Sequence, residues 1–106
     1  MPRPKPIVAL YDHLLALTGS PVVALNRAMA RAEMDGPEAA LADIDLLATD
    51  RRMADYQPYW AARGHLCARA GRREDAREAL TLAIGLSTDP AVRQYLQTQL
   101  AALHDA

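Results

Sequence analysis

Apolar residues recur every three to four positions along most of the chain, a spacing that is typical of amphipathic α-helices. Glycine and proline interrupt this pattern at short intervals, and several prolines fall where a helix would begin, a position that tolerates them well. No stretch alternates with a period of two, so we predict no β-strand. The pattern predicts six helices, at about residues 6–18, 21–34, 37–48, 57–70, 73–86 and 90–104.

Four of the predicted helices carry a clear apolar stripe that we expect to face inward. The polar, unpatterned segment 49–55 is the longest expected connection. The stripes are Ile7, Leu10, Tyr11, Leu14 and Leu17; Val22, Leu25, Ala28, Met29 and Ala32; Ala40, Leu41, Ile44 and Leu47; and Val92, Leu96, Leu100 and Leu103.

Small residues lie along the facing sides of the helices predicted at 57–70 and 73–86. Trp60, Gly64, Cys67 and Gly71 share one face of the first helix, and Ala76, Leu80 and Ala83 share one face of the second. Glycine and alanine allow two backbones to approach closely, so this arrangement predicts a tightly packed pair of antiparallel helices.

The spacing of these residues resembles a tetratricopeptide repeat, a helix–turn–helix unit of about 34 residues. Arg63 and Cys67 stand where the repeat carries leucine and tyrosine, and Pro90 comes two residues late. Aligning Ala40 with Ala76 reveals a second, weaker copy. The resemblance implies an all-α, tetratricopeptide-like right-handed stack of antiparallel helix hairpins in a single domain. Its parts would be a half unit (6–18), two units (21–48 and 57–86) and a capping helix (90–104).

A closer resemblance lies in the run IVALYDHLLALTGSPVVALNRAMARAEMDGPEAAL and in Ala61–Ala83. Both segments resemble the helical C-terminal extension of a subgroup of bacterial extracytoplasmic-function RNA polymerase sigma factors, and the similarity runs from about Ile7 to Leu103. It implies a protein–protein interaction domain that regulates transcription initiation by contacting the sigma-factor core or RNA polymerase. Neither a helix-turn-helix nor a basic recognition helix occurs in this sequence. We therefore expect an excised domain or a stand-alone relative.

Composition narrows the remaining classes of function. The chain has 106 residues and a net charge of −1, so no overall basic field attracts nucleic acid, and we expect no direct contact with it. The single cysteine, Cys67, excludes an internal disulfide and suits a reducing compartment. No apolar run reaches the roughly 18–20 residues that a membrane span needs. We expect a cytoplasmic protein that does not enter membranes.

No pattern in the sequence is typical of catalysis. His13, His65 and His104 fall on different predicted helices, and none has a partner at metal-ligand spacing. Cys67 lies among small residues, where a thiol usually serves for packing. We therefore expect no enzymatic activity, no catalytic residue, no metal and no cofactor.

An arginine cluster, Arg63, Arg69, Arg72, Arg73 and Arg77, is the main charged feature. In one interpretation these are solvated residues near a turn, with Arg77 paired to Glu74. In the other, Arg69, Arg72, Arg73 and Arg77 form a basic docking patch for an acidic partner surface, because guanidinium groups match carboxylates well.

The tetratricopeptide resemblance also implies a groove that holds a peptide or a helix. Asn26 could bind a peptide backbone or a neighbouring helix, since its amide both donates and accepts. A stand-alone adaptor or self-associating scaffold that uses this groove is the alternative function, and the apolar stripe of residues 6–18 predicts a homodimer. The candidate groove residues are Leu25, Asn26, Met29, Glu33, Ala61, His65, Ala68 and Arg69.

Overall fold

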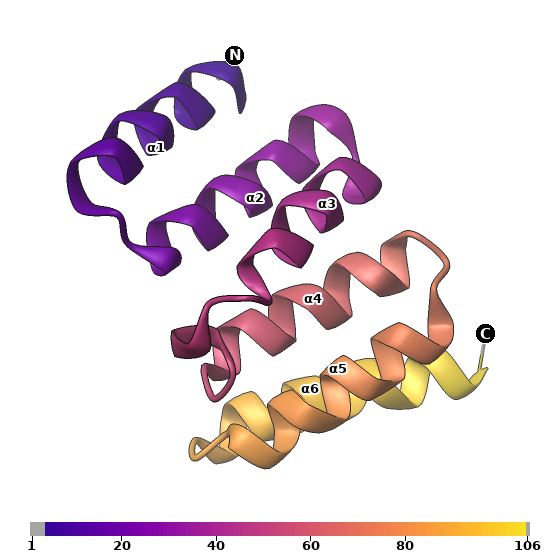
Figure 1. The fold of residues 1–106 in the computed structure, drawn as a ribbon. Coiled ribbons are helices and arrows are strands. Elements are labelled where there is room, and N and C mark those ends of the chain that lie inside the picture. Colours follow the sequence, from indigo (N-terminus) through magenta and orange to yellow (C-terminus); the bar gives the residue numbers. More distant parts are fainter. Residues whose placement is uncertain (1–3, 106) are drawn as a thin grey trace. The chain divides into compact units, whose positions relative to one another are not determined.

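The computed structural model describes the backbone of residues 4–105 and the side chains of residues 7–103. Within this range the chain is all-α, as predicted, and contains no strand (Figure 1). Its elements are α1 (Pro4–Thr18), α2 (Pro21–Asp35), α3 (Pro37–Leu47), the short 3-10 helix η1 (Arg51–Met53), α4 (Gln57–Arg69), α5 (Arg73–Leu86) and α6 (Pro90–Asp105).

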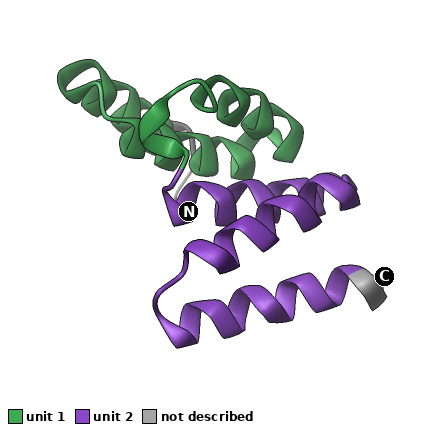
Figure 2. Ribbon diagram, turned by 60° about the horizontal axis from the view of Figure 1, so that its bottom comes forward, with its two compact units in different colours: residues 1–54 green, residues 55–106 purple. Residues whose placement is uncertain are grey.

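The helices form two compact units, residues 1–54 and residues 55–106 (Figure 2). In unit 1, α2 packs against both α1 and α3; in unit 2, α5 packs against both α4 and α6. Short connections make consecutive helices antiparallel neighbours within each unit (Figure 1). The boundary between the units falls at the end of the connection that the sequence marks as the longest. How the predicted repeats stack from one unit to the next stays a prediction.

Helix ends agree with the sequence to within one residue except at the start of α1. We expected this helix to begin at Pro6, but it begins at Pro4. Both prolines fit because the first N–H groups of a helix have no intrahelical acceptor to lose. Residues 1–3 lie outside the described range. Ser20 caps α2, since its side chain accepts a hydrogen bond from the backbone N–H of Val23 at 3.4 Å.

The connection at 49–55, predicted to be unpatterned, contains η1 and a core residue. Asp50 caps this short helix by accepting a hydrogen bond from the backbone N–H of Arg52 at 2.9 Å. Hydrogen bonds from the Arg52 side chain and then from its backbone lower the pKa of Asp50. Met53 is only 2% exposed. A single buried side chain in a polar segment has no periodicity, so the pattern could not identify it.

The contact between α4 and α5 confirms the predicted seam of small residues. Cys67, Ala76 and Ala83 are fully buried. A Cβ atom added to Gly64 would lie 2.7 Å from Cγ of Leu80 and 2.8 Å from its Cδ2. The Leu80 side chain therefore packs so closely on Gly64 that any larger residue at position 64 would force it to shift.

The aromatic residue in this core is not the one we expected. Tyr59 is 1% exposed, whereas Trp60 is only partly buried. The two rings meet edge-on, with centroids 5.0 Å apart and planes at 87°. Consecutive residues on a helix point about 100° apart, so an error of one residue moves the aromatic anchor to a different face.

The turn between α4 and α5 depends on Gly71, whose φ of 80° lies in the left-handed region. The backbone N–H of Arg72 donates to the carbonyl of Cys67 at 2.8 Å, and that of Gly71 donates to the carbonyl of Ala68 at 3.2 Å. These two bonds form a Schellman motif, which satisfies carbonyls at the end of α4 and reverses the chain into α5.

Unit 1 buries most of the stripes predicted for α2 and α3. Leu25, Ala28 and Ala32 of α2, and Ala40, Leu41 and Ile44 of α3, are 4% exposed or less. Val22 was predicted to be buried but is 38% exposed, and Pro21 is the buried residue at the start of α2. In α1 the buried residue is Val8, while Ile7, Leu10 and Leu17 of the predicted stripe are exposed.

Two arginines of α2 connect the three helices of unit 1. Arg27 pairs with Asp12 of α1 and, at 3.3 Å, with Asp43 of α3. Arg31 binds both oxygens of Asp43, at 2.8 and 2.9 Å, and pairs with Asp35 at 3.2 Å. The hydrogen bonds to Asp43, and then to Asp35, raise the pKa of Arg31. These ion pairs are partly exposed, so each adds little to the free energy of unfolding. Their main effect is to link α2 to α1 and α3.

Candidate protein-binding site

The predicted groove takes its residues from α2 in unit 1 and from α4 in unit 2. In α2, Asn26 and Glu33 are exposed and Met29 is partly buried, so these three are accessible to a partner. Leu25 is not, because it is 4% exposed and belongs to the core of unit 1. Including Leu25 in the groove was an error: its side chain points to the interior.

The α4 half of the predicted groove contributes to a pocket within unit 2. Ala61, His65 and Ala68 follow one another at helical spacing, and all three are partly or fully exposed. His65 and Ala68 line a pocket of about 210 Å³ that α4, α5 and α6 form together. Its full lining is Gly64, His65, Ala68, Leu80, Gln99, Ala102 and Leu103. We refer to it below as the α4–α6 pocket.

The α4–α6 pocket exists because small residues face it from two helices. Gly64 and Ala68 on α4, and Ala102 on α6, have no side chains long enough to fill the space. Leu80 of α5 is 1% exposed and Leu103 of α6 is 9% exposed, so both present apolar atoms to the pocket from the core. The seam that lets α4 and α5 approach closely thus also leaves an apolar hollow beside α6.

Two polar side chains border this apolar surface. His65 and Gln99 are both partly buried. Gln99 donates from Nε2 to the hydroxyl of Tyr95 at 3.1 Å, which orients its amide. An imidazole and an amide can each donate and accept a hydrogen bond, as recognition of a peptide backbone requires. Apolar surface with a few polar groups at defined places is characteristic of binding pockets.

The size of the pocket limits what it can hold. Pockets for drug-sized ligands measure about 300–1,000 Å³, whereas an apolar cavity of about 150 Å³ holds one benzene molecule. A hollow of about 210 Å³ therefore suits a single apolar side chain, such as leucine or phenylalanine.

The predicted inward stripe of α6 contains Leu103 but not Gln99 and Ala102, which line the pocket with it. Sequence reasoning missed these two residues. Gln99 and Ala102 have the same spacing as His65 and Ala68 on α4, but this spacing alone does not show that the two helices line one pocket.

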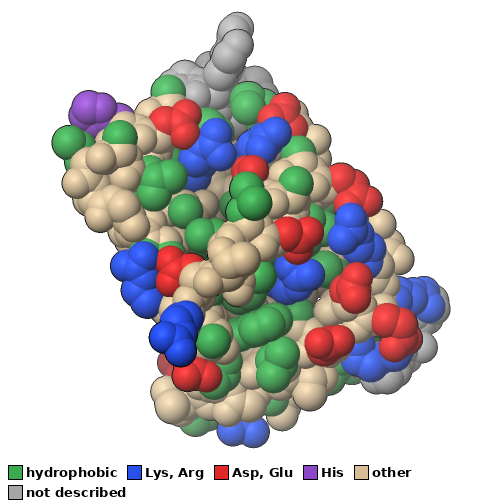
Figure 3. Space-filling view, in the orientation of Figure 1, with side chains coloured by type: hydrophobic (Ala, Val, Ile, Leu, Met, Phe, Trp, Pro, Cys, Tyr) green, Lys and Arg blue, Asp and Glu red, His purple; other side chains and the backbone are tan. Residues whose placement is uncertain are grey.

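The arginine cluster is only partly consistent with a docking patch. Arg77 pairs with Glu74 at 2.6 Å, as the solvated interpretation predicts. Arg69, Arg72 and Arg73 are exposed, and both Arg69 and Arg72 take part in interactions within the chain. Basic and acidic side chains are interspersed over the face that Figure 3 shows. The basic docking patch stays a prediction.

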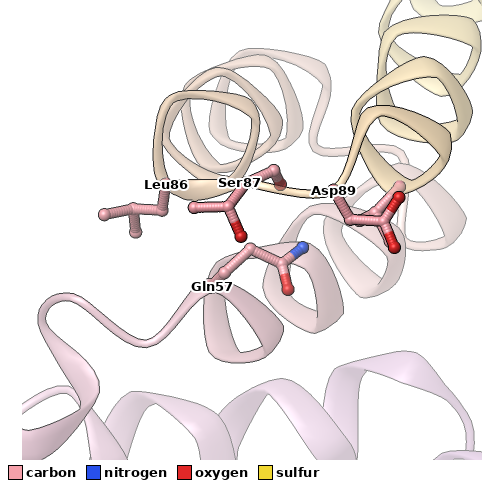
Figure 4. Close-up of a pocket in the computed structure, with 6 residues that line it drawn as sticks. Gln57, Leu86, Ser87 and Asp89 are labelled. Carbon is pink, nitrogen blue, oxygen red and sulfur yellow. The ribbon is translucent and has the colours of Figure 1, made fainter.

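A smaller hollow of about 120 Å³ lies where the α5–α6 connection passes the start of α4 (Figure 4). Gln57 lies across from the Ser87–Asp89 segment in this view. The Ser87 hydroxyl donates to the carbonyl of Ala83 at 2.7 Å, and the Asp89 carboxylate accepts from the backbone N–H of Ala91 at 2.8 Å. Both groups serve to end one helix and begin the next, so this hollow is structural.

Among the described residues, no group of three His, Cys, Asp or Glu side chains lies close enough together to hold a metal ion. Cys67 is buried, and His65 lies at the pocket. His13 is exposed on α1, and the side chain of His104 lies outside the described ones. None of the described helices is long and apolar enough to cross a membrane.

Comparison with known proteins finds a relative of unknown function. The chain is 43% identical over 91 residues to an uncharacterized protein of Rhizobium meliloti (strain 1021). The matched segment covers 86% of this chain but 21% of the relative, so the chain spans about a fifth of the relative's length. No family model and no solved structure matches the chain.

Proposed function

We propose that this chain is a protein-interaction domain that regulates an RNA polymerase sigma factor, and that it binds its partner through the α4–α6 pocket. The observation that carries the binding role is the pocket itself, an apolar hollow bordered by His65 and Gln99. A partner segment would insert one apolar side chain toward Leu80 and place its backbone against the two polar groups.

The sigma-factor assignment is supported by the sequence resemblance described above. The relative from Rhizobium is also consistent with it, because the matching segment is a small part of a much longer polypeptide. A domain of this kind needs no chemistry of its own. It acts if it contacts one conformation of the sigma factor or polymerase more strongly than another, since only a differential contact shifts an equilibrium.

A stand-alone adaptor is the second candidate. It is favoured by the fact that all seven residues lining the pocket belong to unit 2, so that binding requires no neighbouring domain. The two functions differ in genetic context. An open reading frame that continues upstream into polymerase- and promoter-binding regions supports the sigma-factor role, and an isolated frame supports the adaptor.

The sigma-factor role is tested by deleting the region that corresponds to this 106-residue chain from the full-length protein. We expect transcription from the promoters of that sigma factor to fall at least about tenfold while the truncated protein still accumulates, because a contact worth 1.4 kcal/mol changes an equilibrium tenfold. Reporter output and co-purification with RNA polymerase are measured in parallel. Unchanged output from the truncated protein would contradict the regulatory role.

A further inference from the structure

Helix α1 has two apolar faces, and unit 1 uses only one of them. Val8 is 8% exposed, and Leu15, two turns later on the same side, is partly buried. On another side lie Ile7, Leu10 and Leu17, which are 44%, 57% and 71% exposed, together with the partly buried Leu14. We call Ile7, Leu10, Leu14 and Leu17 the α1 seam. Hydrophobic side chains are visible on the surface where Figure 1 places α1 (Figure 3).

The spacing of the α1 seam indicates what kind of structure covers it. Its members are separated by three, four and three residues, which is the a–d–a–d pattern of two coiled-coil heptads. Single exposed leucines, such as Leu46 of α3 at 76%, are ordinary on protein surfaces. Four apolar residues at heptad spacing form instead a continuous stripe onto which another helix can pack knobs into holes.

The charge along α1 favours an identical helix over a charged partner. Between Ile7 and Thr18 the only Asp, Glu, Lys or Arg is Asp12, which is paired with Arg27 of α2. Two copies of the seam would therefore meet without like charges opposing each other, and the seam offers no charge to select an acidic or basic partner. A stripe of leucine and isoleucine is also complementary to itself, as a two-fold interface requires.

We propose that the α1 seam is a self-association surface, on which the seam of a second copy of this chain packs about a two-fold axis. Two heptads form a short interface, so the dimer is weak and dissociates on dilution, with a dissociation constant between about 1 µM and 1 mM. This inference rests on unit 1 alone and is independent of the pocket in unit 2.

Sedimentation equilibrium of the full 106-residue chain tests the inference, with the double variant Leu10→Lys/Leu17→Lys and the control Leu46→Lys. We expect the unmodified chain and the control to have the same dissociation constant for the dimer. The double variant should weaken dimerisation at least tenfold. All three positions are more than half exposed, so each variant should remain folded, which its circular dichroism and melting temperature verify.

Two results would overturn the proposal. If the unmodified chain is strictly monomeric up to about 1 mM, the seam does not bind a second copy, and another polypeptide segment covers it. If the double variant dimerises as strongly as the control, the chain associates through a different surface.

Discussion

Replacing Gly64 with alanine is expected to lower the free energy of unfolding by up to about 2 kcal/mol, although alanine normally stabilises a helix by about 1 kcal/mol relative to glycine. The added methyl group would lie 2.7 Å from Cγ of Leu80, an atom near the backbone, and 3.3 Å from the backbone nitrogen of Leu80, so the α5 backbone limits how far this side chain can withdraw. Overpacking of this kind typically costs about 1–3 kcal/mol, which outweighs the gain in helix propensity. Thermal or urea unfolding of the full chain measures the difference.

Gly85 provides the matched control, because it also lies within a helix but faces open space. No atom lies within 4 Å of the Cβ position there. Gly85→Ala should therefore leave stability unchanged or raise it by up to about 1 kcal/mol. Equal effects of the two substitutions would contradict the close approach of α4 and α5.

A double-mutant cycle with Leu80→Ala identifies the atoms responsible. Leu80→Ala alone should destabilise the chain by about 2–5 kcal/mol, because it empties a core position. It also removes the two atoms that clash with a methyl group at position 64, while the backbone nitrogen of residue 80 stays at 3.3 Å. In this background Gly64→Ala should be neutral or stabilising. If the substitution is equally harmful in both backgrounds, its effect does not arise from Leu80.

Replacing Ala102 with tryptophan is expected to weaken binding of the partner by about 10- to 100-fold without unfolding the domain. Ala102 is exposed and lines the α4–α6 pocket, so an indole at this position can fold into the hollow and occupy the place of the partner's side chain. Loss of a central apolar anchor commonly costs about 2 kcal/mol or more at an interface. The affinity of the full chain for the sigma core or RNA polymerase is the quantity to measure.

Ala101→Trp is the control for this experiment. Ala101 is also exposed on α6, but it points about 100° away from Ala102 and does not line the pocket. We expect it to bind as the unmodified chain does. If both tryptophan variants bind normally and remain folded, the α4–α6 pocket is not the recognition site, even if the domain still binds a polymerase component through another surface.

The sequence predicts helices and their ends well in this chain, because proline and glycine mark most of the boundaries. It predicts less well which residue faces the core where two neighbouring residues are both apolar. Tyr59 and Trp60 are adjacent aromatics, and only the three-dimensional packing decides that Tyr59 is the buried one. Val22 fits the helical period, but the residue buried at the start of α2 is its neighbour Pro21, again a shift of one position.

The candidate site was predicted in part. His65 and Ala68 were correctly placed on an accessible face, since helical spacing alone determines which residues share a side. The opposite wall could not be derived from the repeat pattern, which assigns α6 only a capping role. Whether Gln99 and Ala102 line a pocket depends on the angle at which α6 packs against α5. Local periodicity in the sequence does not encode this angle.

The close contact between Gly64 and Leu80 lets α4 and α5 nest against each other and so shapes the pocket. The nuclear Overhauser effect between the Hα protons of Gly64 and the methyl protons of Leu80, in the isotope-labelled full chain, tests this contact most directly. We expect a strong cross-peak, because Cδ2 of Leu80 lies 2.8 Å from the Cβ position of Gly64. A spectrum in which both residues are assigned and no cross-peak joins them would contradict the account.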